Sequence, residues 1–362
     1  TTTTTTTTTT DDTTSTDDTT ATDDTTADYD VPETYNFSNV SYGGQTDRLN
    51  MLKALTAYIK TSHNDSVDVK LDASVLNNMY ANDGYTWTGD DFPSQPTKDL
   101  ESKTEADAQA EVIALFTEMA DNSGDKDAVA SNGVAGLVPR GSGHILVNAK
   151  GQEYAQLIDK GLMGSCFYYQ GTSKYLSDEK IGDAVDNETV ADEKGTDKEH
   201  HFDEAFGYFG VPIDFPTNTE GLLFWGKYCN KRDGLANTND IMDAFIKGRA
   251  AISAKDKSGQ DAAVADIKEL WEKAAAATGV HYLNDGLANI SNDGDRIHSL
   301  TEGYAFIEAL RYNIDGSVTG ADVDAVLAAL GDNFWTVTES QIEAARNLLA
   351  EKAGLEDIKT DL

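Results

Sequence analysis

Basic residues and long apolar runs are both scarce in this chain of 362 residues. No run of 18 apolar residues occurs, so the sequence predicts no membrane-spanning helix. Lys and Arg number 28 against 63 Asp and Glu, which gives a formal net charge of -35. A chain this acidic repels nucleic acid and anionic membrane surfaces, so we expect neither as a partner.

Cysteine is almost absent, since Cys166 and Cys229 are the only two in the chain. Each lies in an aromatic-rich pattern typical of a helix, and neither has other ligand residues at the spacing of a metal site. We expect two buried free thiols. A disulfide between them is an alternative that the sequence alone does not decide.

Sequence motifs of several enzyme classes are missing as well. The chain contains no Gly-x-Ser-x-Gly, no phosphate-binding loop and no His-Glu-x-x-His. Its 15 tyrosines recur at helical spacing, which favours core or interface positions over a ligand platform. The sequence therefore leaves enzymatic activity open and favours a non-catalytic protein.

Residues 1–30 form a low-complexity segment of threonine and aspartate. Ten threonines precede the hexapeptides Thr-Thr-Ser-Thr-Asp-Asp (13–18) and Thr-Thr-Ala-Thr-Asp-Asp (19–24). Apart from Ala21, Ala27 and Tyr29 this segment has no apolar side chains, too few to form a core, and β-branched threonine disfavours helix, so we predict an extended tail or stalk. Because the chain begins with Thr1 and not Met, we expect a processed or truncated protein, with a removed signal peptide or a lipidated residue upstream.

The tail also carries three copies of one tripeptide, in which an aspartate is followed by two threonines. Thr13, Thr19 and Thr25 each follow such an aspartate. The tripeptide resembles the O-glycosylation signal on exported proteins of Bacteroidota, which implies covalent glycans on these three residues. Ser66, after Asp65, is a further candidate acceptor. The alternative is an unmodified, solvated acidic linker.

An extended tail can also mediate assembly. If it added to a neighbouring copy as a strand or lay in a groove of that copy, the contact would be head-to-tail and need not close. We therefore expect a homo-oligomer or a fibre formed through the N-terminal tail.

From residue 31 onward the composition is that of a folded domain, and helical periodicity predominates. We predict an all-α fold of two packed helical bundles, spanning 31–355 with sub-bundles at about 31–215 and 216–355, before a short C-terminal tail at 356–362. One short strand is expected at 144–148, and a surface loop at 178–195. The expected helices are 45–62, 73–81, 105–120, 152–169, 196–209, 220–230, 239–255, 260–278, 280–290, 295–311, 321–330 and 338–353.

The stretch from Thr196 to Pro216 has the densest aromatic, imidazole and carboxylate content of the chain. Thr196 and Glu199 have the spacing of a capping box, and Gly210 with the following proline predicts the end of the helix. Within it, His201-Phe-Asp-Glu-Ala-Phe-Gly-Tyr-Phe-Gly resembles the signature of an imelysin-like branch, a secreted bacterial family of largely unknown function. Imelysins proper carry Gly-x-His-x-x-Glu; His201 and Glu204 match that pattern, and Glu199 replaces its glycine.

Four further stretches are similar to the same branch, and the resemblance covers roughly residues 31–355. It implies a helical, exported protein at the cell surface or outside the cell. The four stretches are Ala130-Ser-Asn-Gly-Val-Ala-Gly136, Gly151 to Gln170, Ile241 to Ala251, and His298-Ser-Leu-Thr-Glu-Gly-Tyr-Ala-Phe306.

Two histidine–glutamate pairs are the candidate metal ligands. His201 and Glu204 lie three residues apart on one predicted helix, and His298 and Glu302 lie four apart on another, so each pair shares a helix face. If the two helices faced each other, the four groups could bind zinc or iron, or supply a general base and its orienting partner. The alternative is a satisfied polar network between helices with no cofactor. His200 should point elsewhere.

Two short motifs outside these pairs are interpreted as structural. Asn313-Ile-Asp-Gly-Ser-Val318 resembles a calcium loop of the dockerin type, but Arg311 stands at its first ligand position, so we expect a simple turn between helices. Leu137-Val-Pro-Arg-Gly-Ser142 matches the recognition sequence of thrombin, and we expect it in an exposed loop.

Two classes of function follow from these observations. We favour an exported, non-catalytic structural or binding protein with a glycosylated tail that mediates assembly. The second class is a metal-dependent, peptidase-like hydrolase or an iron-handling protein that uses the histidine–glutamate pairs.

Overall fold

The computed structural model describes residues 1–3 and 29–362. Within these residues the chain forms twelve α-helices, one π-helix and one β-hairpin, so the all-α prediction is confirmed. The α-helices are α1 (Gly43–Lys60), α2 (Ala73–Ala81), α3 (Ala106–Asn122), α4 (Tyr154–Leu162), α5 (Asp178–Ile181), α6 (Asp197–Phe209), α7 (Phe224–Ala236), α8 (Ile241–Ala254), α9 (Lys257–Ala288), α10 (Asp293–Ala309), α11 (Gly320–Leu330) and α12 (Glu339–Lys352). The predicted tail falls on residues 4–28, outside the described residues.

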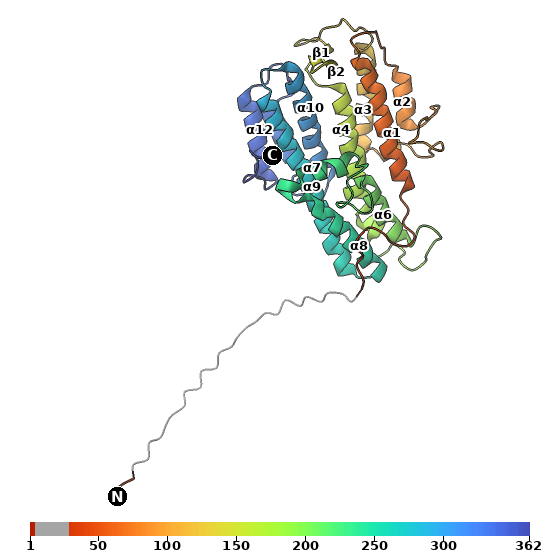
Figure 1. Ribbon diagram of the computed structural model, residues 1–362, viewed down its shortest axis with the longest axis vertical. Helices are drawn as coiled ribbons and strands as arrows, with labels where there is room; N and C mark the ends of the chain where they lie inside the picture. Colours follow the sequence, from red (N-terminus) through yellow and green to blue (C-terminus); the bar gives the residue numbers. More distant parts are fainter. Residues whose placement is uncertain (4–28) are drawn as a thin grey trace.

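The long helix α9 organises the second half of the chain. It packs against α7, α8, α10 and α12, as Figure 1 shows. The sequence predicted two helices here, 260–278 and 280–290, and this prediction is wrong because Gly279 does not end the helix. A Cβ at Gly279 would lie 3.0 Å from Leu349 Cδ2 and 3.3 Å from Ile307 Cγ1, so this glycine permits close packing of α10 and α12 on α9.

The first half of the chain forms a layer of helices beside α10. Helix α4 packs against α1, α3 and α10, while α6 packs against α1, α8 and the π-helix. In Figure 1, α1 to α4 lie beside α10 and α12 in the upper part, and α6 and α8 lie at the lower end. One continuous cluster of buried residues, from Tyr35 to Leu362, runs through both halves of the chain.

The predicted helix at 152–169 changes its winding where α4 ends. From Met163 to Tyr175 the backbone is a π-helix, which is rare and wider than an α-helix. Trp225 Nε1 donates a hydrogen bond to Met163 O at 2.7 Å, so an indole contacts the backbone where the wider turns begin. A Cβ at Gly171 would lie 2.7 Å from the Trp271 ring, so the absence of a side chain there allows the ring to pack directly on the backbone.

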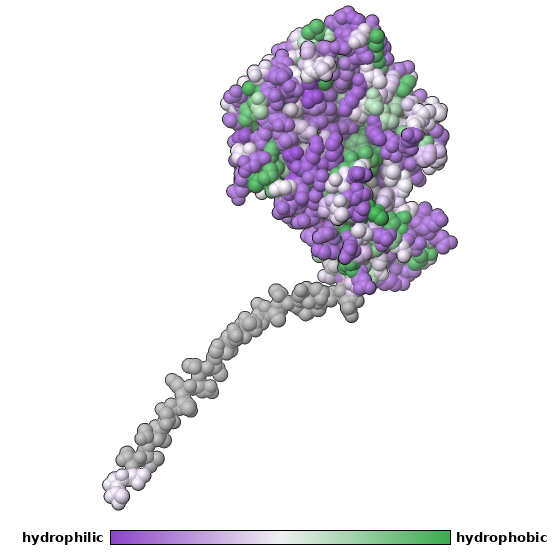
Figure 2. All heavy atoms as spheres, viewed as in Figure 1, coloured by the Kyte–Doolittle hydropathy of each residue, from purple (hydrophilic) through white to green (hydrophobic). Residues whose placement is uncertain are grey.

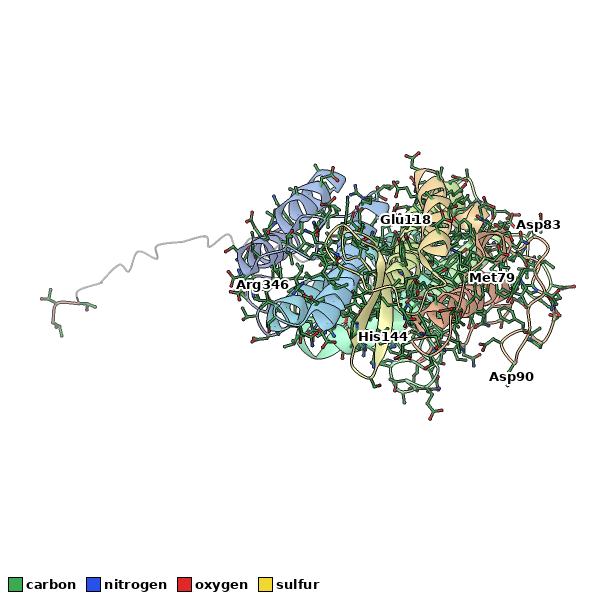
Figure 3. All side chains as sticks on the ribbon, turned by 90° about the horizontal axis from the view of Figure 1, so that it is seen from above. Met79, Asp83, Asp90, Glu118, His144 and Arg346 are labelled. Carbon is green, nitrogen blue, oxygen red and sulfur yellow. The ribbon has the colours of Figure 1, made fainter. Side chains whose placement is uncertain are left out.

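The only sheet in the described residues is the hairpin of β1 (Gly136–Arg140) and β2 (Gly143–Val147). Strand β2 confirms the strand predicted at 144–148. The thrombin-type hexapeptide is not an exposed loop as expected, because Leu137 and Val138 are buried and paired with β2. Figure 3 shows His144 of this hairpin and Glu118 of α3 between Arg346 on one side and Asp83 and Asp90 on the other. Figure 1 shows β1 and β2 at the upper end of the helical body, so the hairpin covers that end of the bundle.

The surface of the helical body is predominantly polar. The face in Figure 2 is mostly hydrophilic, and its apolar residues occur in scattered patches. Among the helices of the described residues, none combines the length and the hydropathy that crossing a membrane requires.

Shorter elements complete the chain. Besides α5, they are single turns of 3₁₀-helix at Thr61–His63, Glu101–Lys103, Thr238–Asp240 and Leu310–Tyr312.

Both cysteines are buried free thiols, as predicted. Burial raises the pKa of Cys166 to about 12 and also raises the pKa of Cys229. We predict that a thiol reagent such as DTNB modifies neither cysteine in the folded protein at pH 8, and both after unfolding in guanidinium, because the reactive thiolate is absent and access is blocked. Rapid modification of the native protein would contradict this prediction, and non-reducing mass analysis provides the control for a disulfide.

Candidate functional site

Helix α6 begins as predicted, with a capping box. Thr196 Oγ1 accepts from Glu199 N, and Glu199 Oε2 accepts from Thr196 N at 2.9 Å. The histidine that lies closest to Glu204 is not the one that the sequence predicted. His201 Nδ1 lies 2.7 Å from Lys180 O, and it is His200 whose Nε2 approaches Glu204 Oε2, at 4.0 Å. The prediction that His200 points elsewhere is wrong, because a spacing of four residues brings these two side chains together on α6.

Glu204 connects three elements by hydrogen bonds. Gln45 Nε2 of α1 donates to Glu204 Oε1 at 2.9 Å, and Tyr175 Oη of the π-helix donates to the same oxygen at 3.3 Å. Burial lowers the pKa of neighbouring His200, although the charge of Glu204 acts in the opposite direction. Glu204 therefore satisfies polar groups between helices, as in the alternative to a metal site.

The most enclosed charge cluster on α6 centres on Asp203, which sequence reasoning missed. Arg249 Nε of α8 donates to Asp203 Oδ1 at 2.9 Å, and Tyr35 Oη donates to the same oxygen at 2.8 Å. Arg249 Nη1 also donates to Glu199 Oε1 at 2.7 Å. Asp203 is 0 % exposed and its Oδ2 has no hydrogen-bond partner. Burial outweighs the charge of Arg249 and raises the pKa of Asp203 to about 6.

The second predicted pair, on α10, belongs to a different polar cluster. His298 Nδ1 lies 2.6 Å from Glu153 Oε2, while His298 Nε2 lies 3.9 Å from Glu302 Oε1. Glu153 precedes α4 and is almost completely buried. Burial alone would raise the pKa of Glu153, but the hydrogen bond and charge of His298, and the charge of His63, outweigh it and lower that pKa. Burial lowers the pKa of His63.

Lys160 of α4 extends this cluster toward α1 and α7. Its Nζ contacts Asp159 Oδ2, lies 3.6 Å from Glu302 Oε1, and lies 5.1 Å from the centre of the Tyr228 ring. Burial lowers the pKa of Lys160, but the carboxylates beside it outweigh burial and hold that pKa well above its ordinary value. We call Glu153, Asp159, Lys160, His298 and Glu302 the buried ion network.

The structure does not bring the two predicted pairs together. His201 contacts α5 through Lys180 O, and Glu204 contacts α1 and the π-helix, whereas His298 and Glu302 contact Glu153 and Lys160. Figure 1 shows α6 and α10 in different parts of the body. Across residues 1–3 and 29–362, no three His, Cys, Asp or Glu side chains are grouped so that they could hold a metal ion. The donor sets therefore do not form the four-ligand zinc or iron centre that the sequence suggested.

A cavity of about 330 Å³ opens beside the buried ion network. We call it the lysine pocket, because Lys53, Lys60, Lys160 and Lys227 line it, with Asp159 as its one acidic residue. Its remaining lining residues come from α1 and from the first turn of α7 with the residues before it, namely Thr56, Ala57, Leu222, Leu223, Phe224 and Tyr228.

Charge and backbone geometry set this pocket apart. Lys53 pairs with Asp91 at 2.8 Å and Lys160 with Asp159 and Glu302, which leaves Lys60 and Lys227 as the lining lysines that have no carboxylate within 4 Å in the described part of the chain. Leu223, at the N-cap of α7, provides no side-chain hydrogen bond to the first amides of that helix. Phe224 has a φ of 41°, a conformation that bulky residues rarely adopt outside functional sites.

Only one of the four predicted glycosylation sites lies among the residues that the structure describes. Thr13, Thr19 and Thr25 lie outside the described residues. Ser66 is exposed in the loop after the 3₁₀ turn at Thr61–His63, where its Oγ donates to Asp65 Oδ1 at 3.2 Å. The calcium-like loop is a turn, as expected, and Arg311 pairs with Glu308 and Asp324 and not with loop carbonyls.

The pKa of Asp203 leads to a test by pH. A folded pKa of about 6 above an ordinary value of 3.8 means that the folded state binds the proton more tightly. Stability from this group therefore rises as the pH falls from 7 to 5, by about 1 kcal/mol. We predict that Asp203→Asn loses this gain, measured by urea unfolding at both pH values, whereas Asp197→Asn, exposed on the same helix, keeps it. Equal pH dependence of the wild type and Asp203→Asn would contradict the assignment.

Comparison with known proteins gives one result. A family model described as "Domain of unknown function (DUF4856)" matches residues 32–356. No curated protein and no solved structure matches the chain. Because the matched region covers most of the sequence, the chain belongs to this family of domains of unknown function.

Proposed function

We propose that this protein is an exported, non-catalytic binding module that takes a small phosphate- or sulfate-bearing ligand in the lysine pocket. The observation that carries the proposal is local charge. In a chain with 63 acidic and 28 basic residues, one cavity is lined by four lysines and a single aspartate. Two of these lysines, Lys60 and Lys227, have no carboxylate within 4 Å in the described part of the chain, and an anion bound between them would reduce the repulsion of their charges.

The details of the pocket support this choice of ligand. The first turn of α7 lies at the cavity, and a helix N-terminus attracts anions through its free amides and its dipole. Burial lowers the pKa of nearby Lys231, and the positive charge of Lys227 acts in the same direction. A volume of about 330 Å³ accommodates a small metabolite or a terminal sugar.

The histidine–glutamate pairs have a structural role in this proposal. Each pair satisfies polar groups at a helix interface, and the lysine pocket contains neither histidine. This arrangement supports a binding protein over the metal-dependent hydrolase or the iron-handling protein.

The proposal places the module at the cell surface or outside the cell. Two sequence features support this: the resemblance of residues 31–355 to the imelysin-like branch, and the three aspartate–threonine tripeptides of the tail. We propose that the domain is a distant relative of the imelysins, and that the tail carries O-linked glycans and joins copies into an oligomer or fibre. Ser66, exposed on the folded body, offers a fourth acceptor.

The lysine pocket is tested by ligand titration. We predict that glucose 6-phosphate and inorganic phosphate bind the wild type, that glucose does not, and that Lys227→Gln weakens phosphate binding about 5- to 30-fold, the effect of losing one close charge. Calorimetry at low and high salt measures this, and binding should weaken as salt rises.

Lys247→Gln is the matched control, because Lys247 is exposed on α8 and does not line the pocket. It removes the same charge and should leave binding unchanged. Absence of phosphate binding, or equal loss in both variants, would refute the proposal.

The tail is tested on material purified from the native source. We predict that the intact mass exceeds the sequence mass by glycan increments that map to Thr13, Thr19 and Thr25, because each follows an aspartate. A variant with alanine at Asp12, Asp18 and Asp24 should lose these increments. Negative-stain microscopy should show assemblies of the full chain and only monomers after deletion of residues 1–30. An unmodified mass together with monomeric full-length particles would refute both parts.

A further inference from the structure

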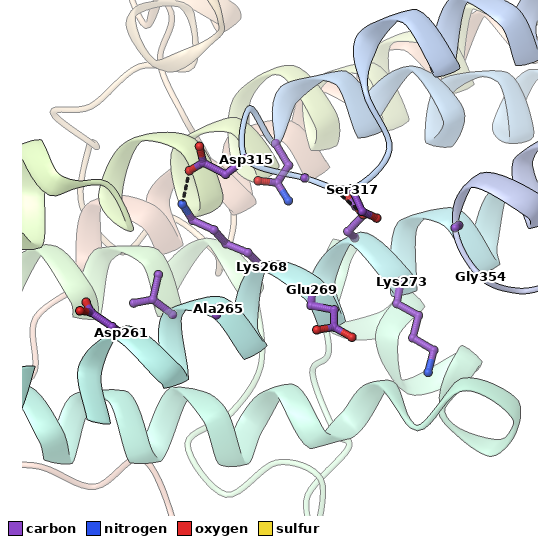
Figure 4. Close-up of a pocket in the computed structure, with 13 residues that line it drawn as sticks. Asp261, Ala265, Lys268, Glu269, Lys273, Asp315, Ser317 and Gly354 are labelled. Carbon is purple, nitrogen blue, oxygen red and sulfur yellow. Dashed lines mark hydrogen bonds and ion pairs between the residues drawn. The ribbon is translucent and has the colours of Figure 1, made fainter. Parts of the chain in front are cut away.

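A second cavity, of about 670 Å³, lies along α9 on the side of the calcium-like loop. Its walls are α9, the turn from Asn313 to Ser317, and the end of α12 at Ala353 and Gly354. Figure 4 shows Lys268 reaching Asp315 across one wall, where the two groups pair at 2.6 Å. The cavity shares no lining residue with the lysine pocket.

Two buried side chains in this cavity have polar atoms without partners. Glu272 is 5 % exposed and Asn313 is 4 % exposed. Glu272 Oε2, Asn313 Oδ1 and Asn313 Nδ2 have no partner with the geometry of a hydrogen bond, and neither does the buried hydroxyl of Tyr168 beside Asn313. Leaving such atoms unpaired costs about 1–3 kcal/mol each. A ligand that enters the cavity and forms hydrogen bonds with these atoms would recover that free energy.

The other oxygen of Glu272 explains why the side chain is held in this position. Glu272 Oε1 accepts hydrogen bonds from Ser317 N at 3.0 Å and Val318 N at 3.3 Å, and from Ser317 Oγ. A Cβ at Gly316 would lie 2.0 Å from Glu272 Oε2, so this glycine provides the space that the free oxygen occupies. The carboxylate is thus fixed by one oxygen, and the second oxygen is buried without a hydrogen-bond partner.

The unpaired atoms specify the chemistry of a ligand. Two acceptors, Glu272 Oε2 and Asn313 Oδ1, require donors, and Asn313 Nδ2 requires an acceptor close to them. Two free oxygens are too few for Ca²⁺, which takes six to eight. Four carboxylates and two lysines line the cavity, so its formal charge favours a cation. An ammonium group supplies three donors and a positive charge.

We propose that this cavity binds a small primary amine that has an oxygen on the neighbouring carbon, as in amino sugars and amino-acid amides. The ammonium donates to Glu272 Oε2 and Asn313 Oδ1, and the neighbouring oxygen accepts from Asn313 Nδ2. The exposed part of the lining, at Asp261 and Glu269, accommodates the rest of the molecule. This inference is independent of the anion proposed for the lysine pocket.

The test is calorimetric titration of the full chain with four probes. Glucosamine and glycinamide represent the two sources of the proposed group, and we expect at least one to bind. Glucose has a hydroxyl in place of the ammonium and loses the charge-assisted hydrogen bond to Glu272. Putrescine lacks the neighbouring oxygen and loses the neutral hydrogen bond from Asn313 Nδ2. Each should bind about tenfold more weakly or worse. Preference for glucosamine or for glycinamide identifies the source.

Variants locate the binding to this cavity. Glu272→Gln should weaken binding of the preferred probe about tenfold or more, whereas Asp266→Asn, which removes an exposed carboxylate of α9 outside the cavity, should leave it unchanged. Asn313→Leu is the second variant if Glu272→Gln fails to fold, and circular dichroism checks the fold of each. Failure of both amines to bind the wild type, unchanged binding to both Glu272→Gln and Asn313→Leu, or displacement of the probe by stoichiometric Ca²⁺ would overturn the inference.

Discussion

The burial of Lys160 is the constraint on which much of the upper body depends. An ammonium group inside a helical core is unfavourable unless carboxylates compensate it, and Asp159 and Glu302 do so from α4 and α10. Glu302 in turn faces His298, whose other ring nitrogen contacts Glu153. One enclosed charge thus fixes the arrangement of α4 and α10 and brings a positive group to the wall of the lysine pocket.

A comparable arrangement fixes the lower body through a different pair of helices. Arg249 of α8 is 1 % exposed and binds two carboxylates of α6, Glu199 and Asp203. The same Glu199 completes the capping box, so the start of α6 and its attachment to α8 depend on one side chain. Losing Arg249 would leave Glu199 and the completely buried Asp203 without a cation, a large destabilisation in a helical core.

Local signals predicted the helices well and the site poorly, for a physical reason. The capping box at Thr196 and the apolar spacing of α1 to α3 depend on neighbours in sequence, and the structure confirms them. Glu153 meets His298 across 145 residues, and the four lysines of the pocket come from three separate helices. Such long-range contacts leave no pattern in the local sequence. The histidine–glutamate pair of α6 was therefore predicted to lie beside the pair of α10, whereas in the structure each pair contacts other residues.

The packing of Trp271 on Gly171 and beside Trp225 provides an internal optical reporter. Both indoles are fully enclosed, with ring centres 6.2 Å apart, and Tyr168 lies against each of them. Their emission in the native protein should be that of an apolar environment, and it should shift to longer wavelength when α9 separates from the π-helix. Once Trp87 and Trp335, the other two tryptophans, are replaced by phenylalanine, intrinsic fluorescence reports on the junction between the two halves of the chain without any added label.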